Sequence, residues 1–266
     1  MYQALYEPIP DIDGYFERLG ISGPIHRDTP WLDALILAHQ MSIPFENLDV
    51  FEGLAPINLR IGALYQKIIT GRRGGYCFEL NALFHALLRD CGFRAWPCIC
   101  RIVRGKDFTP PVLHRGTIIE MDGRLFFGDV GYGGPMPPGV LPVEDGSRRY
   151  LVDTAFRLNF KGGSWWALIR ETAEGPEPIL EFSTNPVDPV DFIALNYYCE
   201  NHPQSIFRQL RMVNRRTPGG SCAITGDIFT QWTPEGKETY SVASPAVRFD
   251  TLEQAFGIPR ASLNRS

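Results

Sequence analysis

Residues 72–92 read RRGGYCFELNALFHALLRDCG, and this stretch predicts a glycine-rich turn that leads into a buried helix. Two glycines precede Tyr76, and apolar residues then recur at helical spacing until Gly92 ends the helix. Cys77 is therefore expected at or near the first turn of that helix. The apolar positions fall at i, i+3, i+4, i+7, i+8 and i+11: Leu80, Leu83, Phe84, Leu87, Leu88 and Cys91.

The sequence before this stretch also reads as helices. Residues 11–19 end at Gly20, residues 31–41 follow a Thr29 cap with Pro30 in the first turn, and residues 57–70 precede Gly71. Each of these segments has a start or stop signal of its own. The first third of the chain is therefore predicted to be helical.

Beyond Gly92 the pattern changes to strands. Residues 93–103 are rich in apolar and β-branched types, and residues 115–121 and 124–130 flank the hairpin turn signal Asp122-Gly123. Helices followed by strands favour the α+β class over a doubly wound sheet. Further strands are expected at 150–158, 165–171, 179–183, 208–214, 221–232 and 238–242, with helices at 187–200 and 251–256.

Composition narrows the classes of partner. The chain has 266 residues, of which 44% are hydrophobic, and can bury a large core. Its 26 basic and 30 acidic residues are spread without a basic block, so a small molecule is favoured over nucleic acid. No leader or long apolar run is seen, so we expect a soluble cytoplasmic protein with no membrane partner.

Six cysteines are too sparse for a disulfide scaffold, and none shows the spacing of a structural zinc site. We therefore expect buried, reduced thiols and no metal site. Cys77 differs from the others because its thiol would lie beside the free N–H groups and positive dipole of a helix start, which stabilise a thiolate. The alternative is that Cys77 is a small buried hydrophobe, a common fate of free cysteine.

The predicted hairpin supplies partners for this thiol. A two-residue turn at 122–123 places Asp129 opposite Gly116, with His114 two residues further along the same strand face. Their Cα atoms would lie roughly 7–8 Å apart, and Gly116 would leave room for the imidazole. An aspartate that orients a histidine completes a Cys-His-Asp triad. The alternative is a surface pair without a role in catalysis.

The other histidines are weaker candidates for a general base. His26 falls in a loop, His39 and His85 on helices, and His202 before a proline, so each is expected to be structural or solvated. His85 lies eight residues beyond Cys77, about 12 Å along the helix axis at about 1.5 Å per residue. That separation is too large for it to take the thiol proton.

Several motifs together resemble the arylamine N-acetyltransferases: SIPFENLD at 42–49, RGGYCFE at 73–79, His114, and DVGYGG at 129–134. Their order and separations fit that family, with 37 residues from Cys77 to His114 and 15 from His114 to Asp129. The resemblance implies that Cys77, His114 and Asp129 form the catalytic triad.

The same resemblance implies further site residues. Phe45 and Tyr132 would line the acyl and amine pocket, and Gly131, Gly133 and Gly134 would form the loop that coenzyme A approaches. Tyr132 stands where the family is expected to have phenylalanine, which bears on amine preference more than on chemistry.

The implied fold has a helical bundle at 1–92, a β-barrel at 93–189 and an α/β lid at 190–266. The triad would lie where the first two parts meet, as in cysteine proteases. Glu46 and Arg73 look like the family's structural ion pair behind the site, outside catalysis.

The implied reaction is ping-pong N-acetylation of arylamines or arylhydrazines, a step of xenobiotic metabolism, through an acyl-cysteine. Acetyl-CoA is then a co-substrate, and no permanently bound cofactor or metal is expected. A transglutaminase-like or papain-like hydrolase, an amide synthase of the same family and a non-enzymatic binding protein are the alternatives. The sequence does not fix the acceptor, the acyl chain or the oligomeric state.

Overall fold

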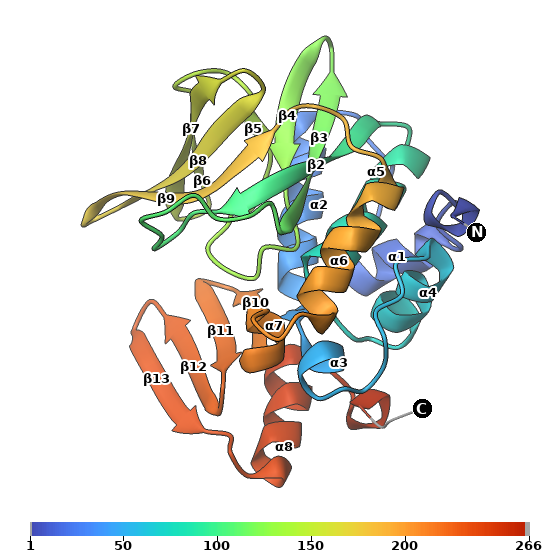
Figure 1. The fold of residues 1–266 in the computed structure, drawn as a ribbon, viewed down its shortest axis with the longest axis vertical. Coiled ribbons are helices and arrows are strands. Elements are labelled where there is room, and N and C mark those ends of the chain that lie inside the picture. The colour runs from blue at the N-terminus through green and yellow to red at the C-terminus, as the bar shows by residue number, and fades with distance from the viewer. Residues whose placement is uncertain (1, 264–266) are drawn as a thin grey trace.

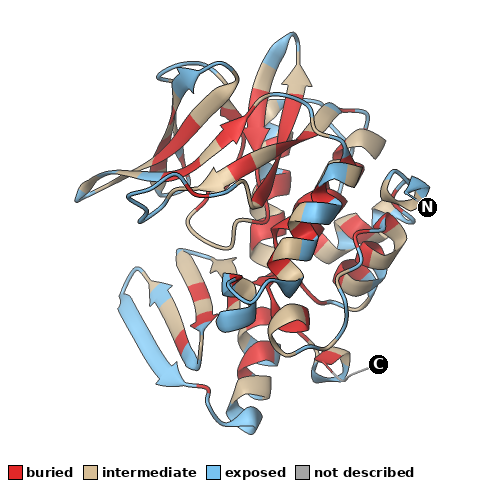
Figure 2. Cartoon of the chain, viewed as in Figure 1, coloured by how far each residue is buried: buried red, intermediate tan, exposed pale blue. Residues whose placement is uncertain are grey.

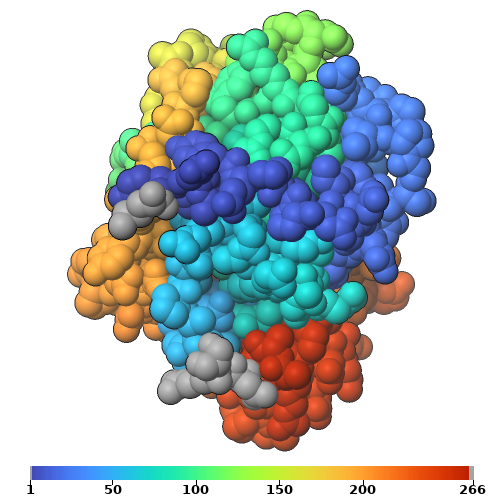
Figure 3. All heavy atoms as spheres, turned by 90° about the vertical axis from the view of Figure 1, so that its right-hand side faces the viewer, coloured from blue at the N-terminus to red at the C-terminus, as the bar shows by residue number. Residues whose placement is uncertain are grey.

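The computed structural model describes residues 2–263, and its N-terminal helices lie mainly to the right of two sheets, one above the other (Figure 1). Seen from the side, segments of the N-terminal third lie between the barrel strands at one end and the C-terminal helix at the other (Figure 3). The helices and helical turns of this part are η1 (Gln3–Leu5), α1 (Ile12–Leu19), α2 (Thr29–Ser42), α3 (Leu48–Phe51), α4 (Ile61–Tyr65), the π-helical η2 (Gln66–Thr70) and α5 (Cys77–Asp90).

Eight antiparallel strands form a nearly closed barrel in the order β5-β4-β3-β2-β9-β8-β7-β6. The sheet curls far enough for β5, at one edge, to contact β7, next to the other edge. Its strands are β2 (Arg94–Ile102), β3 (His114–Met121), β4 (Arg124–Gly128), β5 (Leu141–Pro142), β6 (Arg148–Leu151), β7 (Thr154–Gly162), β8 (Trp165–Thr172) and β9 (Gly175–Ser183).

The last third forms a second antiparallel sheet in the order β1-β10-β11-β12-β13. Its edge strand β1 (Phe45–Glu46) comes from the helical part, where Phe45 pairs with Asn214. The other elements are η3 (Pro189–Asp191), α6 (Phe192–Asn201), α7 (Ile206–Gln209), β10 (Met212–Thr217), β11 (Gly220–Thr225), β12 (Ile228–Thr233), β13 (Gly236–Ser241), α8 (Pro245–Phe256) and η4 (Arg260–Leu263).

Helix α5 is the centre of the core. Eleven of its residues are buried, and it contacts α4, β2 and β3. At the outer edge of the second sheet, by contrast, β13 is exposed along its length (Figure 2). The largest apolar cluster joins the helices to Ile119, Phe126 and Val130 of the barrel and to Phe192 of α6. Packing therefore crosses the expected boundaries at 92 and 189, as β1 also does, and the division into three parts stays a prediction.

The α+β class is confirmed, and so are α1, α5 and the hairpin of β3 and β4. Five local predictions need correction. The strand expected at 208–214 begins only at Met212, because Ile206–Gln209 form α7. The side chain of Asp28, not Thr29, caps α2. The helix predicted at 57–70 begins only at Ile61, and the N–H of Ile57 donates to the carboxylate of Glu200 instead of lying within a helix. The strands expected at 150–158 and 221–232 are each a hairpin, turning at Val152 (φ 56°) and Gly226 (φ 61°).

Within residues 2–263, no helix is long and apolar enough to cross a membrane. Nor does any group of His, Cys, Asp and Glu side chains in that range have the arrangement of a metal site.

Candidate active site

Cys77 is the first residue of α5, and its backbone position is fixed from both sides. The preceding Tyr76 is extended, and its N–H donates to Oε2 of Glu79 at 3.1 Å, which closes the first turn. The Cys77 side chain is only 2% exposed. The helix start predicted from the sequence is therefore confirmed.

The thiol lies against the backbone on both sides of His114. Its Sγ is 3.9 Å from the carbonyl oxygen of Leu113, and the backbone of Arg115 hydrogen-bonds to the sulfur. Burial raises the pKa of Cys77 well above its ordinary value, while hydrogen bonds from the backbone of Arg115 and Phe78 lower it. The helix start thus lowers the pKa of Cys77 in the predicted direction, but desolvation is the larger effect and leaves the pKa raised.

His114 and Asp129 form a buried pair. The β3–β4 hairpin has the predicted register, from Met121 opposite Arg124 to Thr117 opposite Gly128, and Asp129 follows directly. Nε2 of His114 is 2.6 Å from Oδ2 of Asp129, and both side chains are at most 2% exposed. The surface-pair alternative is thereby wrong.

Gly116 does not leave room for the imidazole of His114, contrary to the prediction from the sequence. The space beside its Cα is filled by other side chains. A Cβ there would lie 2.7 Å from the Phe127 ring and 3.1 Å from Sγ of Cys100. Gly116 therefore makes room for barrel packing.

Asn81 was missed by the sequence analysis. Its Nδ2 donates to Oδ1 of Asp129 (2.8 Å) and to the carbonyl of Arg115 (2.6 Å), and its Oδ1 accepts the N–H of Val130 (3.1 Å). It lies four residues after Cys77, so α5 presents the thiol and the residue that fixes the aspartate on one face. A buried amide within an apolar helix was the available signal.

The loop after Asp129 packs tightly on this site. A Cβ on Gly131 would lie 3.0 Å from Cα of Cys77, and one on Gly133 would lie 2.5 Å from the Phe45 ring. Tyr132 packs edge-on against the His114 ring, with centroids 6.0 Å apart. Tyr132 thus lies against His114 and Phe45 against Gly133, and their role in an acyl and amine pocket stays a prediction.

A cavity of about 580 Å³ opens beside this loop, between the barrel and the second sheet. Gly133, Gly134 and Phe45 border it, whereas Gly131 packs on α5, so contact of Gly131 with coenzyme A stays a prediction. Of the triad candidates, none borders the cavity. Its charged lining consists of Arg104, Arg170, Arg215, Arg216 and Asp153.

Gln40 of α2 connects this cavity to the buried pair. Its Nε2 donates to the carbonyls of Asp129 (3.3 Å) and Pro137 (2.9 Å), and its Oε1 accepts from Nε of Arg216 (3.1 Å). Gln40 therefore holds Asp129 and Pro137, which lie on either side of the loop. This residue was not identified by the sequence analysis.

The remaining histidines have other roles. His39 bonds to the Tyr15 hydroxyl (3.0 Å), His85 to the carbonyl of Ala95 (3.2 Å), and His26 is exposed. Burial lowers the pKa of His39 and His85 to about 3, so both are neutral. All six cysteines are free and buried, and the Glu46–Arg73 ion pair is present at 2.8 Å, as predicted.

Comparison with known proteins identifies the family of this chain. The family model for N-acetyltransferases matches residues 28–263. The arylamine N-acetyltransferase / N-hydroxyarylamine O-acetyltransferase of Salmonella typhimurium is 32% identical over 93% of this chain and 88% of that protein. The arylamine N-acetyltransferase of Mycobacterium bovis is 30% identical over 95% and 91%.

Solved structures give the same result. Arylamine N-acetyltransferase from Salmonella typhimurium superposes with a TM-score of 0.87 at 31% identity, covering 95% of this chain and 92% of that one. The Mycobacterium marinum enzyme in complex with CoA gives 0.88 at 28% identity, covering 96% and 95%. With a family match over most of its length and a shared fold, this chain belongs to the arylamine N-acetyltransferase family.

Proposed function

We propose that this chain transfers an acetyl group from acetyl-CoA to the nitrogen of an aromatic amine or hydrazine, through an acetyl-cysteine on Cys77. The observation that supports this most directly is the packing of the Cys77 thiol against the backbone on both sides of His114, whose ring is held by Asp129. The names of its relatives point to the same activity.

In the first half-reaction, His114 accepts the Cys77 proton through Nδ1, because Nε2 is occupied by Asp129. Since burial raises the pKa of the thiol, the thiolate forms together with an imidazolium that Asp129 stabilises. The sulfur attacks the thioester carbonyl, and the positive end of the α5 dipole favours the developing oxyanion. The bond from the carbonyl carbon to the coenzyme sulfur then breaks, and that sulfur takes the proton from His114.

In the second half-reaction, the amine nitrogen attacks the acetyl-cysteine carbonyl. His114 takes a proton from that nitrogen, the carbon–sulfur bond breaks, and the proton returns to the departing Cys77 sulfur. Aromatic amines suit this step because they are neutral near pH 7, whereas alkyl amines are mostly protonated. Conversion of a thioester to an amide is downhill, which drives the reaction forward.

The cavity beside the loop is the proposed coenzyme A site. Of its four arginines, Arg104 and Arg170 pair with Glu177, whereas Arg215 and Arg216 form no ion pair within residues 2–263. These two guanidinium groups suit the phosphates of the coenzyme, which guanidinium binds in a bidentate manner. Gly133 and Gly134 would let the pantetheine chain approach, while Phe45 and Tyr132 would enclose the acetyl group and the amine. Because Cys77 is buried and does not border this cavity, access of the thioester to the thiol requires a movement of the residues that cover it.

Initial rates over a matrix of acetyl-CoA and 4-aminosalicylate concentrations test the proposal. A ping-pong route through acetyl-cysteine predicts parallel double-reciprocal lines and an inactive Cys77→Ser variant. Converging lines would show direct transfer within a ternary complex and contradict the intermediate. A cytoplasmic location and a role in xenobiotic metabolism are part of the same proposal.

A further inference from the structure

Behind the nucleophile lies a second cavity, of about 330 Å³, that shares no lining residue with the first among the described residues. It is bordered by four charged side chains that are at most 17% exposed, together with small apolar residues. The charged members are Asp49, Lys67, Arg73 and Glu79.

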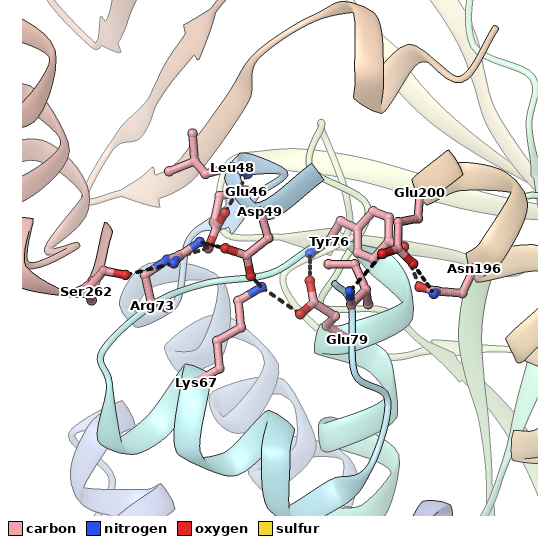
Figure 4. A network of polar contacts seen from close by, with 11 residues as sticks. Glu46, Leu48, Asp49, Lys67, Arg73, Tyr76, Glu79, Asn196, Glu200 and Ser262 are labelled. Atoms are coloured by element: carbon pink, nitrogen blue, oxygen red, sulfur yellow. Dashed lines mark hydrogen bonds and ion pairs between the residues drawn. The ribbon is translucent and has the colours of Figure 1, made fainter. Parts of the chain in front are cut away.

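These side chains belong to one chain of ion pairs (Figure 4). Arg73 bridges Glu46 and Asp49 at 2.8 Å each, and Lys67 bridges Asp49 (2.8 Å) and Glu79 (2.6 Å). Three carboxylates thus face two cations. With every group ionised, this chain of ion pairs would carry one unbalanced negative charge in a buried place, which is costly.

Glu79 joins the chain of ion pairs to the helix turn that carries Cys77. While Oε1 accepts from Lys67, Oε2 accepts the N–H of Tyr76, the residue before the thiol (Figure 4). Gly75 allows this reach: a Cβ there would lie 2.8 Å from Oε2 and 2.9 Å from Cβ of Glu79. The second glycine of the GGYC sequence is therefore required by the glutamate two residues beyond the cysteine.

We propose that Glu79 is a positioning residue for Cys77: its ionised carboxylate holds the Tyr76 amide, and so sets the thiol against the backbone that flanks His114. This rests on the proposed function, in which Cys77 is the nucleophile. A charge-assisted hydrogen bond is about twice as strong as a neutral one, so protonation of Glu79 loosens the turn. Reactivity of Cys77 then rises as Glu79 ionises.

That ionisation falls near neutral pH. Burial raises the pKa of Glu79 to about 7, with Asp49 and Glu46 also raising it and Lys67 lowering it. Lys67 of η2 stays protonated, since the surrounding carboxylates raise its pKa beyond the ordinary value. Arg73, from the loop before α5, is likewise a permanent cation. Glu79 therefore changes its charge near pH 7 while both cations of the chain of ion pairs stay charged.

The test is the rate at which iodoacetamide alkylates Cys77, followed by peptide mass from pH 5.5 to 9, which needs no acetyl-CoA. Glu79→Ala should slow alkylation about tenfold to a hundredfold. Glu79→Gln, which keeps a neutral acceptor for the Tyr76 amide, should recover most of that rate and lose the step near pH 7. The KM for acetyl-CoA should stay unchanged in both variants.

Two further variants complete the design. Gly75→Ala keeps the carboxylate but displaces it, and should slow alkylation as Glu79→Ala does. Glu171→Gln makes the same chemical change at a glutamate that bonds to Arg148 in the barrel instead, and should react as the wild type does.

Wild-type rates and pH profiles in both Glu79 variants would overturn the proposal. So would losses that Gln does not rescue and that only follow the melting temperature. If alkylation depends on Glu79 but wild type is never acetylated, the proposed function fails while the positioning role stands.

Discussion

Replacement of Asn81 by alanine tests how the site is held together. The change removes three buried hydrogen bonds and leaves the Val130 N–H and the Arg115 carbonyl without that partner. At about 1 kcal/mol for each lost bond and about 1 to 2 kcal/mol in total for the two stranded groups, the free energy of unfolding should fall by about 4 to 5 kcal/mol. At about 2–4 °C per kcal/mol for a chain of this size, melting should drop by about 10 °C.

Catalysis should suffer as well, because Asp129 then keeps only the Gly131 N–H on Oδ1 and is free to rotate away from His114. We expect kcat to fall about tenfold to a hundredfold, because Asp129 no longer orients His114. The KM for acetyl-CoA should stay nearly unchanged.

Urea unfolding and steady-state acetylation of 4-aminosalicylate measure the two effects. His85→Ala is the matched control, since it also removes a hydrogen bond from α5 and should reduce stability without changing kcat. Wild-type kcat in a folded Asn81→Ala variant would refute the role assigned to this residue.

Three other changes probe separate parts of the molecule. Gly131→Ala puts a methyl group 3.0 Å from Cα of Cys77, so overpacking should cost about 1–3 kcal/mol in urea unfolding and slow acetylation; full stability would show a looser loop. Arg216→Met should raise the KM for acetyl-CoA about tenfold, measured at fixed amine, with kcat preserved; an unchanged KM would place the phosphates elsewhere. Burial lowers the pKa of His39 from 6.5 to about 3. The stability that the buried neutral ring contributes is therefore fully present above pH 6.5 and is lost as pH falls toward 3. The unfolding free energy of wild type should therefore decline more steeply between pH 7 and 4 than that of His39→Gln, and equal slopes would contradict this.

Features encoded by neighbouring residues could be predicted from the sequence. The apolar spacing and Gly92 predicted α5, and Asp122-Gly123 predicted the hairpin register that pairs His114 with Asp129. In both cases the signal and the structure lie within a few residues of each other.

Features that depend on packing between segments distant in sequence could not be predicted. The pairing of Phe45 with Asn214 joins segments far apart in sequence. The turn at Val152 contains neither a glycine nor an asparagine, so the sequence has no strong turn signal there. Likewise, a helix start predicts a stabilised thiolate at Cys77, but the burial that opposes it comes from the barrel and α6. The residues next to Cys77 in sequence do not show how far the folded chain removes its thiol from water.

The most direct test of the account is the intact mass of the protein after incubation with acetyl-CoA in the absence of amine. Wild type should gain one acetyl group per chain, located on Cys77 by peptide mapping, and should lose it when 4-aminosalicylate is added. Cys77→Ala should gain none. An acetyl group that appears equally on both proteins, or on neither, would contradict the acetyl-cysteine route.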